Sequence, residues 1–466
     1  FGMGGTSRID FLGNDVDTTS DTNLFGEENE NGFSRNQTGV IGLSHLYYFN
    51  SNTYSKVSLG ASNVSVQYDE DSLSATDRSP VRTENVDYRQ TKYSLNWLLS
   101  RKFNARNTLQ GGYIGDLYDF SLFNRVYFPD QGLTPIRDTR GNTLLSQAHA
   151  QWQHKFNDRV TLNAGLNLLH LSLNGSLALE PRLGLRYQIN PRTSFNAGYG
   201  YHSQMQPLLA YFKAATLEDG RRVLTNRELG FTRSQHFALG LDRMVTETLR
   251  LKAEAYYQRI TKAAVQPYPT SYSVLNTGAD FDSPDEDSLV NNGTGRNYGL
   301  ELTAEKFYGN GYYFLVTASL YDSKYEGSDQ IRRNTAFNGG YVLNVLAGKE
   351  FKVGRKNNVL NLDWKVTAAG GRYATPLDFE QSRRAGTEVY REDQAFSNQL
   401  TDYFRTDLKL SYRMNRARVT HEFSLDLQNV TNNQNLFAQR YNARTNRVVN
   451  EYQIGFFPIP QYRILF

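Results

Sequence analysis

The sequence predicts an all-β protein, a large antiparallel transmembrane β-barrel with short turns at one end and long loops at the other. Three observations predict this fold. Long runs alternate between apolar and polar residues, the polar side of these runs carries charges of both signs, and short and long connections alternate along the chain. A strand with lipid on one face and a wet lumen on the other needs this pattern, because successive side chains point to opposite faces.

The clearest alternating runs lie at residues 92–103, 249–257, 298–305, 360–367 and 404–413. In the second of them Leu251 and Tyr257 point to one face, whereas Lys252 points to the other. Strands of soluble sandwiches are mostly about five or six residues long, so runs of this length favour a membrane barrel. Near Leu168 and Leu169 the alternation slips by one residue, which predicts a β-bulge.

The connections between these runs sort into two classes that alternate along the chain. Short ones, rich in Asn, Gly, Asp and Pro, are centred on residues 51–52, 104–106, 157–158, 190–192, 246–247, 309–310, 354–356 and 415–416. Long ones cover roughly residues 14–37, 70–87, 122–141, 207–228, 265–295, 326–337, 373–400 and 431–450, and only the connection at 174–175 breaks the rule. We therefore expect about eighteen strands. The first is expected at Ser7–Leu12, because the glycine-rich residues before it show no strand pattern.

Composition narrows the protein class. The chain has 466 residues with 31 Tyr, 27 Phe and 3 Trp, and this tyrosine content suits the aromatic girdles of a membrane barrel. It has no cysteine, which excludes disulfides and thiolate metal sites, and no apolar run approaches the length of a membrane helix. The net charge is +4 without a concentrated basic patch, so we expect no nucleic-acid partner. Because the sequence begins with Phe1 and no charged-then-apolar signal segment follows it, we expect the chain to be processed or, preferably, to be a fragment.

Functional side chains are expected on the charged face of the strands, which would line the lumen. The candidates for contact with a ligand or with a domain inside the barrel are Arg250, Lys252, Glu254, Glu301, Glu305, Arg405, Asp407 and Lys409. For any one of them an ordinary hydrated lumen face is the alternative. The seven histidines show no metal-ligand spacing, and the acidic stretch 280–287 lacks the spacing of a calcium loop, so we expect no metal, cofactor or catalytic site.

Four motifs resemble one family when they are taken in order. They are the Glu180-Pro181-Arg182 stretch within 177–187, the Gly-to-acidic alternation in 293–302, the Asn429-Val-Thr-Asn432 stretch, and the terminal strand that ends at Phe466. Together they resemble the TonB-dependent outer-membrane receptors, and with residues 201–208 they are similar to the receptors of Bacteroidetes-type bacteria. The resemblance identifies Tyr462, Ile464 and Phe466 as the signal that the barrel-assembly machinery reads.

The resemblance implies a function and some missing parts. Receptors of this family close about 22 strands around a plug domain. They take up a scarce or bulky nutrient with energy from the TonB complex of the inner membrane. The chain, residues 1–466, is therefore expected to be an N-terminally incomplete outer-membrane barrel. The plug, a carboxypeptidase-regulatory-like domain and about four strands would lie outside it, and one of those strands would pair with the terminal strand in place of Ser7–Leu12.

Two other functions remain open from the sequence. A passive porin of about eighteen strands would have the same alternation and the same sorted loops. A structural or enzymatic barrel, such as an adhesin or an outer-membrane hydrolase, is the third hypothesis, and the absence of a catalytic motif argues against its enzymatic form. The expected partners are the TonB complex, the barrel-assembly machinery, outer-membrane lipid and a small ligand whose chemistry the sequence does not specify.

Overall fold

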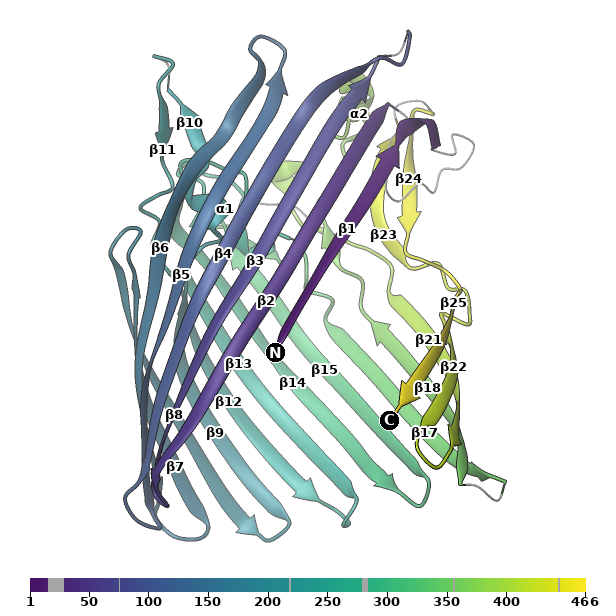
Figure 1. Ribbon diagram of the computed structural model, residues 1–466. Coiled ribbons are helices and arrows are strands. Elements are labelled where there is room, and N and C mark those ends of the chain that lie inside the picture. The colour runs from purple at the N-terminus through teal and green to yellow at the C-terminus, as the bar shows by residue number, and fades with distance from the viewer. Residues whose placement is uncertain (16–28, 75, 218, 279–283, 355–356, 443–444) are drawn as a thin grey trace.

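The fold is seen in a computed structural model of the chain. The structure describes residues 1–15, 29–74, 76–217, 219–278, 284–354, 357–442 and 445–466. Within these residues one antiparallel sheet of 19 strands curves into a barrel wall, as Figure 1 shows. No helix in the described part of the chain is long and apolar enough to cross a membrane.

Each long strand pairs with the next one along the chain, which makes the sheet a meander. The long strands are β1 (Gly2–Leu12), β2 (Glu30–Asn50), β3 (Thr53–Leu73), β4 (Pro80–Lys102), β5 (Asn107–Phe128), β6 (Gly132–Lys155), β7 (Val160–Leu171), β8 (Ser176–Asn190), β9 (Thr193–Gln204), β12 (Thr232–Met244), β13 (Leu249–Val265), β14 (Val290–Gly309), β15 (Tyr312–Glu326), β17 (Tyr341–Val353), β18 (Asn358–Ala369), β21 (Tyr403–Asn415), β22 (Thr420–Gln428) and β25 (Phe457–Leu465). The remaining strand, β16 (Arg332–Asn334), is a short addition beside β15. The predicted fold class and strand number are therefore confirmed.

Short elements lie in the connections at one end of the barrel, which we call the loop end, and the opposite end is called the turn end (Figure 1). These elements are η1 (Gly13–Asp15), α1 (Leu208–Tyr211), β10 (Ala214–Thr216), β11 (Arg222–Leu224), η2 (Val274–Asn276), β19 (Tyr373–Ala374), α2 (Phe379–Ala385), η3 (Glu392–Gln394), β20 (Asn398–Gln399), β23 (Leu436–Asn442) and β24 (Arg447–Tyr452). At the turn end, Asn310 and Gly311 join β14 to β15 with φ of 57° and 82°. Two positive φ values define the tight hairpin turn that Asn-Gly favours.

The strand register separates two faces of the wall. Tyr93 of β4 lies opposite Leu117 of β5, and both are exposed to the outside. Likewise Ala255 of β13 lies opposite Leu300 of β14 on that same outer face. The charged residues between them point inward. The predicted alternation is therefore confirmed, and the outer face is an apolar band suited to lipid.

Strand length varies strongly around the barrel, and this corrects two expected loops. The stretches 70–87 and 122–141 are mostly strand, because β3 extends to Leu73, β4 starts at Pro80, and only residues 129–131 separate β5 from β6. A membrane crossing needs about 9–11 residues, so β2 to β6 rise far above it. There the outer face meets water instead of lipid, and the regular apolar alternation disappears although the backbone ladder continues. Figure 1 shows these strands as the tall purple-to-blue side of the wall.

The first strand was also placed too late in the chain. β1 begins at Gly2 rather than at Ser7, and Gly2, Gly4 and Gly5 all pair with β2. A ladder is made by backbone N–H and C=O groups, so glycines can belong to a strand without adding to its side-chain pattern. Within the described residues β1 pairs only with β2 and β25 only with β22, and no ladder joins β1 to β25.

Candidate ligand-binding lumen and its folded cap

All eight charged lumen candidates lie on the inner face of the wall. Arg250, Lys252 and Glu254 come from β13, and Glu301 lies directly opposite Glu254 in the register. They form two groups, one on β13 and β14 and one on β21, with β15, β17 and β18 between them. The structure therefore brings the candidates together within each group but does not unite them in one site.

The first group is largely satisfied by its own ion pairs. The Nε atom of Arg250 donates to Oδ1 of Asp242 over 3.0 Å, and its Nη1 lies 3.7 Å from Oε2 of Glu305. Nζ of Lys252 lies 2.8 Å from Oε2 of Glu254. Such half-exposed pairs contribute only about 0–1 kcal/mol each. They are an ordinary hydrated lumen face, apart from Glu301, which forms no ion pair among the described residues.

The second group anchors a turn that the sequence did not single out as structural. Oδ1 of Asp407 accepts from Nε of Arg405 over 2.7 Å and from the backbone N–H of Asn429 over 2.8 Å. Asn429 is buried, and its Nδ2 donates to the carbonyl of Asn433 over 2.9 Å. Within the described residues Lys409 has no ion pair. Arg405 and Asp407 therefore position the Asn429 turn, whereas Lys409 is available to other groups.

The lumen at the loop end is filled beside β4 to β9 by a folded cap. We define the cap as residues 205–217, 219–231, 266–278 and 284–289. Phe212 of the cap packs on Phe120 of β5 with ring centroids 4.8 Å apart, and Tyr211 is completely buried. The buried cluster joins cap residues to residues of β5, β7, β8 and β13, with members Phe120, Leu122, Leu169, Leu171, Ala178, Leu208, Tyr211, Phe212, Leu229, Phe231, Ala264 and Leu289.

This cap explains the slip in alternation at Leu168 and Leu169, where the predicted β-bulge is wrong. The pairings of β7 with β6 and β8 show no register shift. Leu168 points outward and is 41% exposed, whereas Leu169 and Leu171 point inward and are buried under the cap. Leu169 and Leu171 are apolar although they face the lumen, because the folded cap covers them and removes them from water.

One fully buried arginine ties the cap to the barrel wall. The Nε atom of Arg137, on β6, donates to the carbonyl of Leu209 over 3.1 Å, and Nη1 donates to Oη of Tyr88 over 3.2 Å. Its Nη2 donates to the carbonyl of Pro284 over 3.1 Å and also to the carboxylate of Asp285. The flat guanidinium thus binds both halves of the cap at once. Sequence reasoning missed Arg137 because it lies in the expected loop 122–141.

A buried asparagine joins the two halves of the cap to each other. Nδ2 of Asn226 donates to the carbonyls of Ala210 and Glu286 over 2.9 and 2.8 Å. Its Oδ1 accepts from the N–H of Leu289 over 2.7 Å. Of the acidic stretch 280–287, residues 280–283 lie outside the described part, and Asp285 is held by Arg137. The described residues contain no group of three or more side chains suited to holding a metal ion.

Burial also shifts titrations within the cap. It raises the pKa of Tyr211 to about 12 and lowers the pKa of Lys213. The Tyr211 hydroxyl accepts a hydrogen bond from the N–H of Gln206 over 3.0 Å. Because the folded pKa of Tyr211 lies above the unfolded value of 10.0, its contribution to stability is complete below pH 10. That contribution is lost as the pH rises through the folded pKa.

We therefore expect the cap to loosen between about pH 10 and 12, by roughly 2–3 kcal/mol. Limited proteolysis of the cap by subtilisin, measured from pH 9 to 12, checks this prediction. Tyr211→Phe is the matched control, because it keeps the buried ring and removes the titrating group. An equally steep rise in cleavage with pH in Tyr211→Phe would show that other groups cause the loosening.

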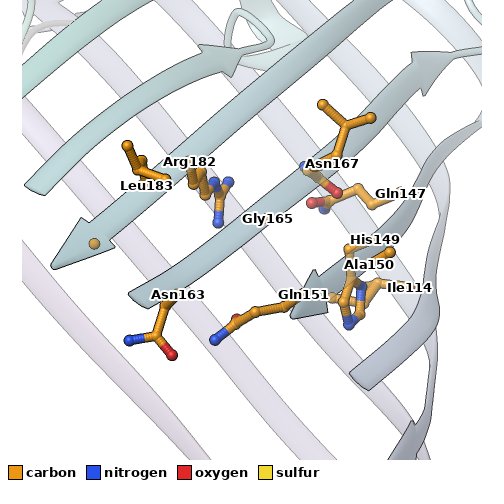
Figure 2. A pocket seen from close by; sticks show the side chains of 12 residues that line it. Ile114, Gln147, His149, Ala150, Gln151, Asn163, Gly165, Asn167, Arg182 and Leu183 are labelled. Atoms are coloured by element: carbon orange, nitrogen blue, oxygen red, sulfur yellow. The ribbon is translucent and has the colours of Figure 1, made fainter. Parts of the chain in front are cut away.

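Below the cap the inner wall of β5 to β8 has a polar hollow of about 420 Å³. Figure 2 shows its side chains, which come from neighbouring strands and include Gln147, Gln151, Asn163 and Arg182. Beside the hollow, Glu180 is buried, and its carboxylate lies 2.9 Å from Arg182. Amide and guanidinium groups of this kind can hold polar surfaces by hydrogen bonds, but they do not form a catalytic arrangement.

The comparison with known families decides the identity of this barrel. The family described as "TonB dependent receptor-like, beta-barrel" matches residues 2–432. The chain belongs to this family. Its wall is thus that of a Gram-negative outer-membrane barrel, with the loop end outside the cell and the turn end in the periplasm. The passive-porin alternative is not favoured by this membership. No curated protein sequence matches the chain.

Solved structures share the fold of this TonB-dependent receptor barrel. The ferric yersiniabactin uptake receptor FyuA from Yersinia pestis has a TM-score of 0.67 at 14% identity, covering 100% of this chain and 67% of that one. The pyoverdine receptor FpvA from Pseudomonas aeruginosa has a TM-score of 0.66 at 12% identity, covering 99% and 67%. The ferric preacinetobactin receptor BauA from Acinetobacter baumannii has a TM-score of 0.62 at 13% identity, covering 94% and 64%. The chain therefore spans about two thirds of these receptors.

Proposed function

We propose that this chain is the barrel of an outer-membrane receptor that takes up a scarce or bulky nutrient with TonB-supplied energy. The observation that carries the proposal is the folded cap in a barrel of this family, held from inside by Arg137. A receptor needs an ordered outer surface to capture a ligand, and the cap gives one side of the lumen such a surface. Neither a catalytic nor an adhesive role is part of this proposal.

The remaining parts of the receptor belong to the same proposal. Both edge strands, β1 and β25, lack a second partner among the described residues, and exposed edges are costly for a barrel in lipid. Further strands that close the wall and a plug in the lumen would remove that cost. A carboxypeptidase-regulatory-like domain and a Bacteroidetes-type origin are supported only by the resemblance that the four motifs and residues 201–208 make together. The role of Tyr462, Ile464 and Phe466 in barrel assembly is likewise proposed from the sequence resemblance of the terminal strand.

Within the lumen, we propose that Glu301 and Lys409 contact the plug or the ligand. They are the two charged candidates without an ion pair in the described part of the chain, and the register places Asp363 and Asp426 on either side of Lys409. A ferric siderophore is the first ligand class to examine, since FyuA, FpvA and BauA are named for ferric or siderophore ligands.

Uptake measurements test the proposed function. The full-length receptor is expressed in cells that do or do not contain TonB, and uptake of a panel of radiolabelled ferric siderophores is followed. We expect saturable uptake that collapses to background without TonB. Glu301→Gln and Lys409→Gln are expected to weaken the apparent affinity by about tenfold or more, because one hydrogen bond to a charged group contributes about 1.5–3 kcal/mol.

The control for these variants is Lys252→Gln, which removes an equal charge from a residue already paired with Glu254. It is expected to leave the apparent affinity unchanged. Uptake that stays linear with concentration and independent of TonB would instead identify a diffusion channel and reject the receptor proposal.

A further inference from the structure

The outer face of β13, β14 and β15 changes character abruptly at one level. On β13 the lipid-facing residues end at Tyr257, and the next residue on that face is Arg259. The register places Tyr257 opposite Tyr298 and Arg259 opposite Arg296. On the following strand Lys324 lies opposite Arg296. Two aromatic rings, with Asp322 beside them on β15, are therefore followed directly, toward the loop end, by a row of three cations.

These cations border a hollow of about 280 Å³ on the outer surface of the barrel. We call Arg259, Arg296, Lys324 and Arg332, which line it, the basic hollow. Its walls also include Tyr257, Glu326 and residues of β14. The hollow lies on the outer face of the wall and is separate from the lumen and the cap.

The basic hollow keeps an excess of positive charge. Arg332 is paired with Glu326 at 2.9 Å, whereas Asp322 lies only at the edge of ion-pair range, 4.0 Å from Arg296 and 3.8 Å from Lys324. Arg259 is exposed and has no ion pair within the described residues. The guanidinium of Arg296 lies over the ring of Tyr298, 5.4 Å from its centroid, which keeps the cation beside the aromatic row.

On another part of the wall the cations do not follow the outward-facing band directly. On β4, β5 and β6 the row above Tyr93 and Leu117 consists of Thr91, Asp119 and Asn142, with one carboxylate and no cation. Arg89 and Arg140 flank Ser121 in the row after that, and Arg89 is paired with Asp87 at 3.0 Å. The basic hollow therefore differs from this part of the wall because its cations lie directly beside the outward-facing tyrosines.

We propose that the basic hollow binds the phosphate groups of a lipid in the outer leaflet. Its occupant must be anionic and must have an apolar part, because the cations lie directly above the lipid-facing band. Arginine side chains suit phosphate because their planar fork donates two parallel hydrogen bonds, and Lys324 adds a point charge. The acyl chains of that lipid would lie along Tyr257, Tyr298 and the leucines below them. The site is independent of the transported ligand.

Lipid binding in nanodiscs tests this proposal with the whole chain. The protein is reconstituted in phosphatidylcholine nanodiscs to which lipid A, a glycolipid with two phosphates, is added, and bound lipid A is counted by native mass spectrometry. The double variant Arg259→Gln/Arg296→Gln is expected to bind lipid A about tenfold more weakly. The single variant Arg259→Gln, at an exposed position, should weaken binding in the same direction if the double variant does not fold.

The matched control is Arg101→Gln/Arg243→Gln, which removes two outward-facing cations near the turn end. Its affinity for lipid A is expected to stay within about twofold of the wild type, because these cations lie at the other boundary of the bilayer. Equal binding of lipid A by wild type and Arg259→Gln/Arg296→Gln would overturn the proposal. Full displacement of lipid A by about 10 mM inorganic phosphate would also overturn it, since the hollow would then be a site for free anions.

Discussion

Replacing Arg137 with methionine is expected to release the cap from the barrel wall while the wall itself stays folded. The change removes the fully buried guanidinium and leaves the carbonyls of Leu209 and Pro284 without this donor, whereas the hydroxyl of Tyr88 keeps its hydrogen bond from Nδ2 of Asn124. Removing one partner of a buried, hydrogen-bonded ion pair costs about 3–5 kcal/mol. Asp285 is half-exposed and can regain water, so the lower part of that range is expected.

Hydrogen–deuterium exchange of the purified protein measures this effect. Amides of the cap, residues 205–217 and 284–289 in particular, should exchange faster, whereas those of β12 to β15 should not change. Arg140→Met, an exposed position on the same strand, is the matched control. Unchanged protection of the cap in Arg137→Met would show that apolar packing around Tyr211 and Phe212 holds the cap without the arginine.

The variant Arg137→Lys separates charge from geometry. It keeps a positive charge near Asp285, but a single ammonium cannot reach acceptors on both halves of the cap and on Tyr88 as the guanidinium fork does. Arg137→Lys is therefore expected to lose most of the protection that Arg137→Met loses. The guanidinium nitrogens of Arg137 donate in several directions at once, and this explains why an arginine occupies the position.

The apolar alternation predicted the membrane band well because lipid imposes it. Leu251, Leu300 and Trp97 are exposed on the outer face, as lipid requires, and the charged candidates opposite them point inward. Above the membrane the outer face of a strand meets water, and the inner face meets either water or the cap, so no regular apolar alternation marked the upper parts of β3 to β6. Arg137 therefore lay in an expected loop. The slip in alternation at Leu169 marks a real structural feature, but that feature is contact with the cap and not the predicted β-bulge.

The candidate site was less predictable than the fold, for a related reason. A charge on a strand face reveals that the face is wet, but not whether a neighbouring strand already neutralises it. Arg250 and Arg405 are both paired within the wall, whereas Glu301 and Lys409 are not. Arg250 is paired across the ladder with Asp242 and Glu305, which the sequence of its own strand does not reveal. Arg405 pairs with Asp407 two residues along the same strand, so that pairing was open to prediction from the sequence.

Replacing Asn429 with alanine is expected to have the largest effect on barrel assembly. Asn429 is buried with φ of 48°, and its side chain binds both the carbonyl and the N–H of Asn433, over 2.9 and 3.0 Å. Alanine loses both hydrogen bonds and must still adopt the left-handed backbone region. Together these losses amount to roughly 3–5 kcal/mol.

The loss of these hydrogen bonds is expected to affect the terminal strand, because the same turn positions the start of β25. Nδ2 of Asn429 reaches the carbonyl of Ile454 at 3.4 Å, and Oδ1 of Asn432 accepts from the N–H of Phe456 over 2.9 Å. A loosened turn therefore leaves the strand from Phe457 to Leu465 without a fixed register against β22. We expect less folded barrel in the outer membrane and a lower thermal unfolding temperature, measured by the heat-dependent gel mobility of membrane extracts and by circular dichroism.

Two variants at the same position divide the effect into its parts. Asn429→Gly removes the side-chain hydrogen bonds but accepts the positive φ, and Asn429→Asp keeps an oxygen to receive the N–H of Asn433. The expected order of stability is wild type, then Asp, then Gly, then Ala, with Gly recovering about 1 kcal/mol relative to Ala. If Ala were as stable as Gly, backbone strain would contribute nothing. The motif would then act only through the hydrogen bonds that link β21 to the start of β25.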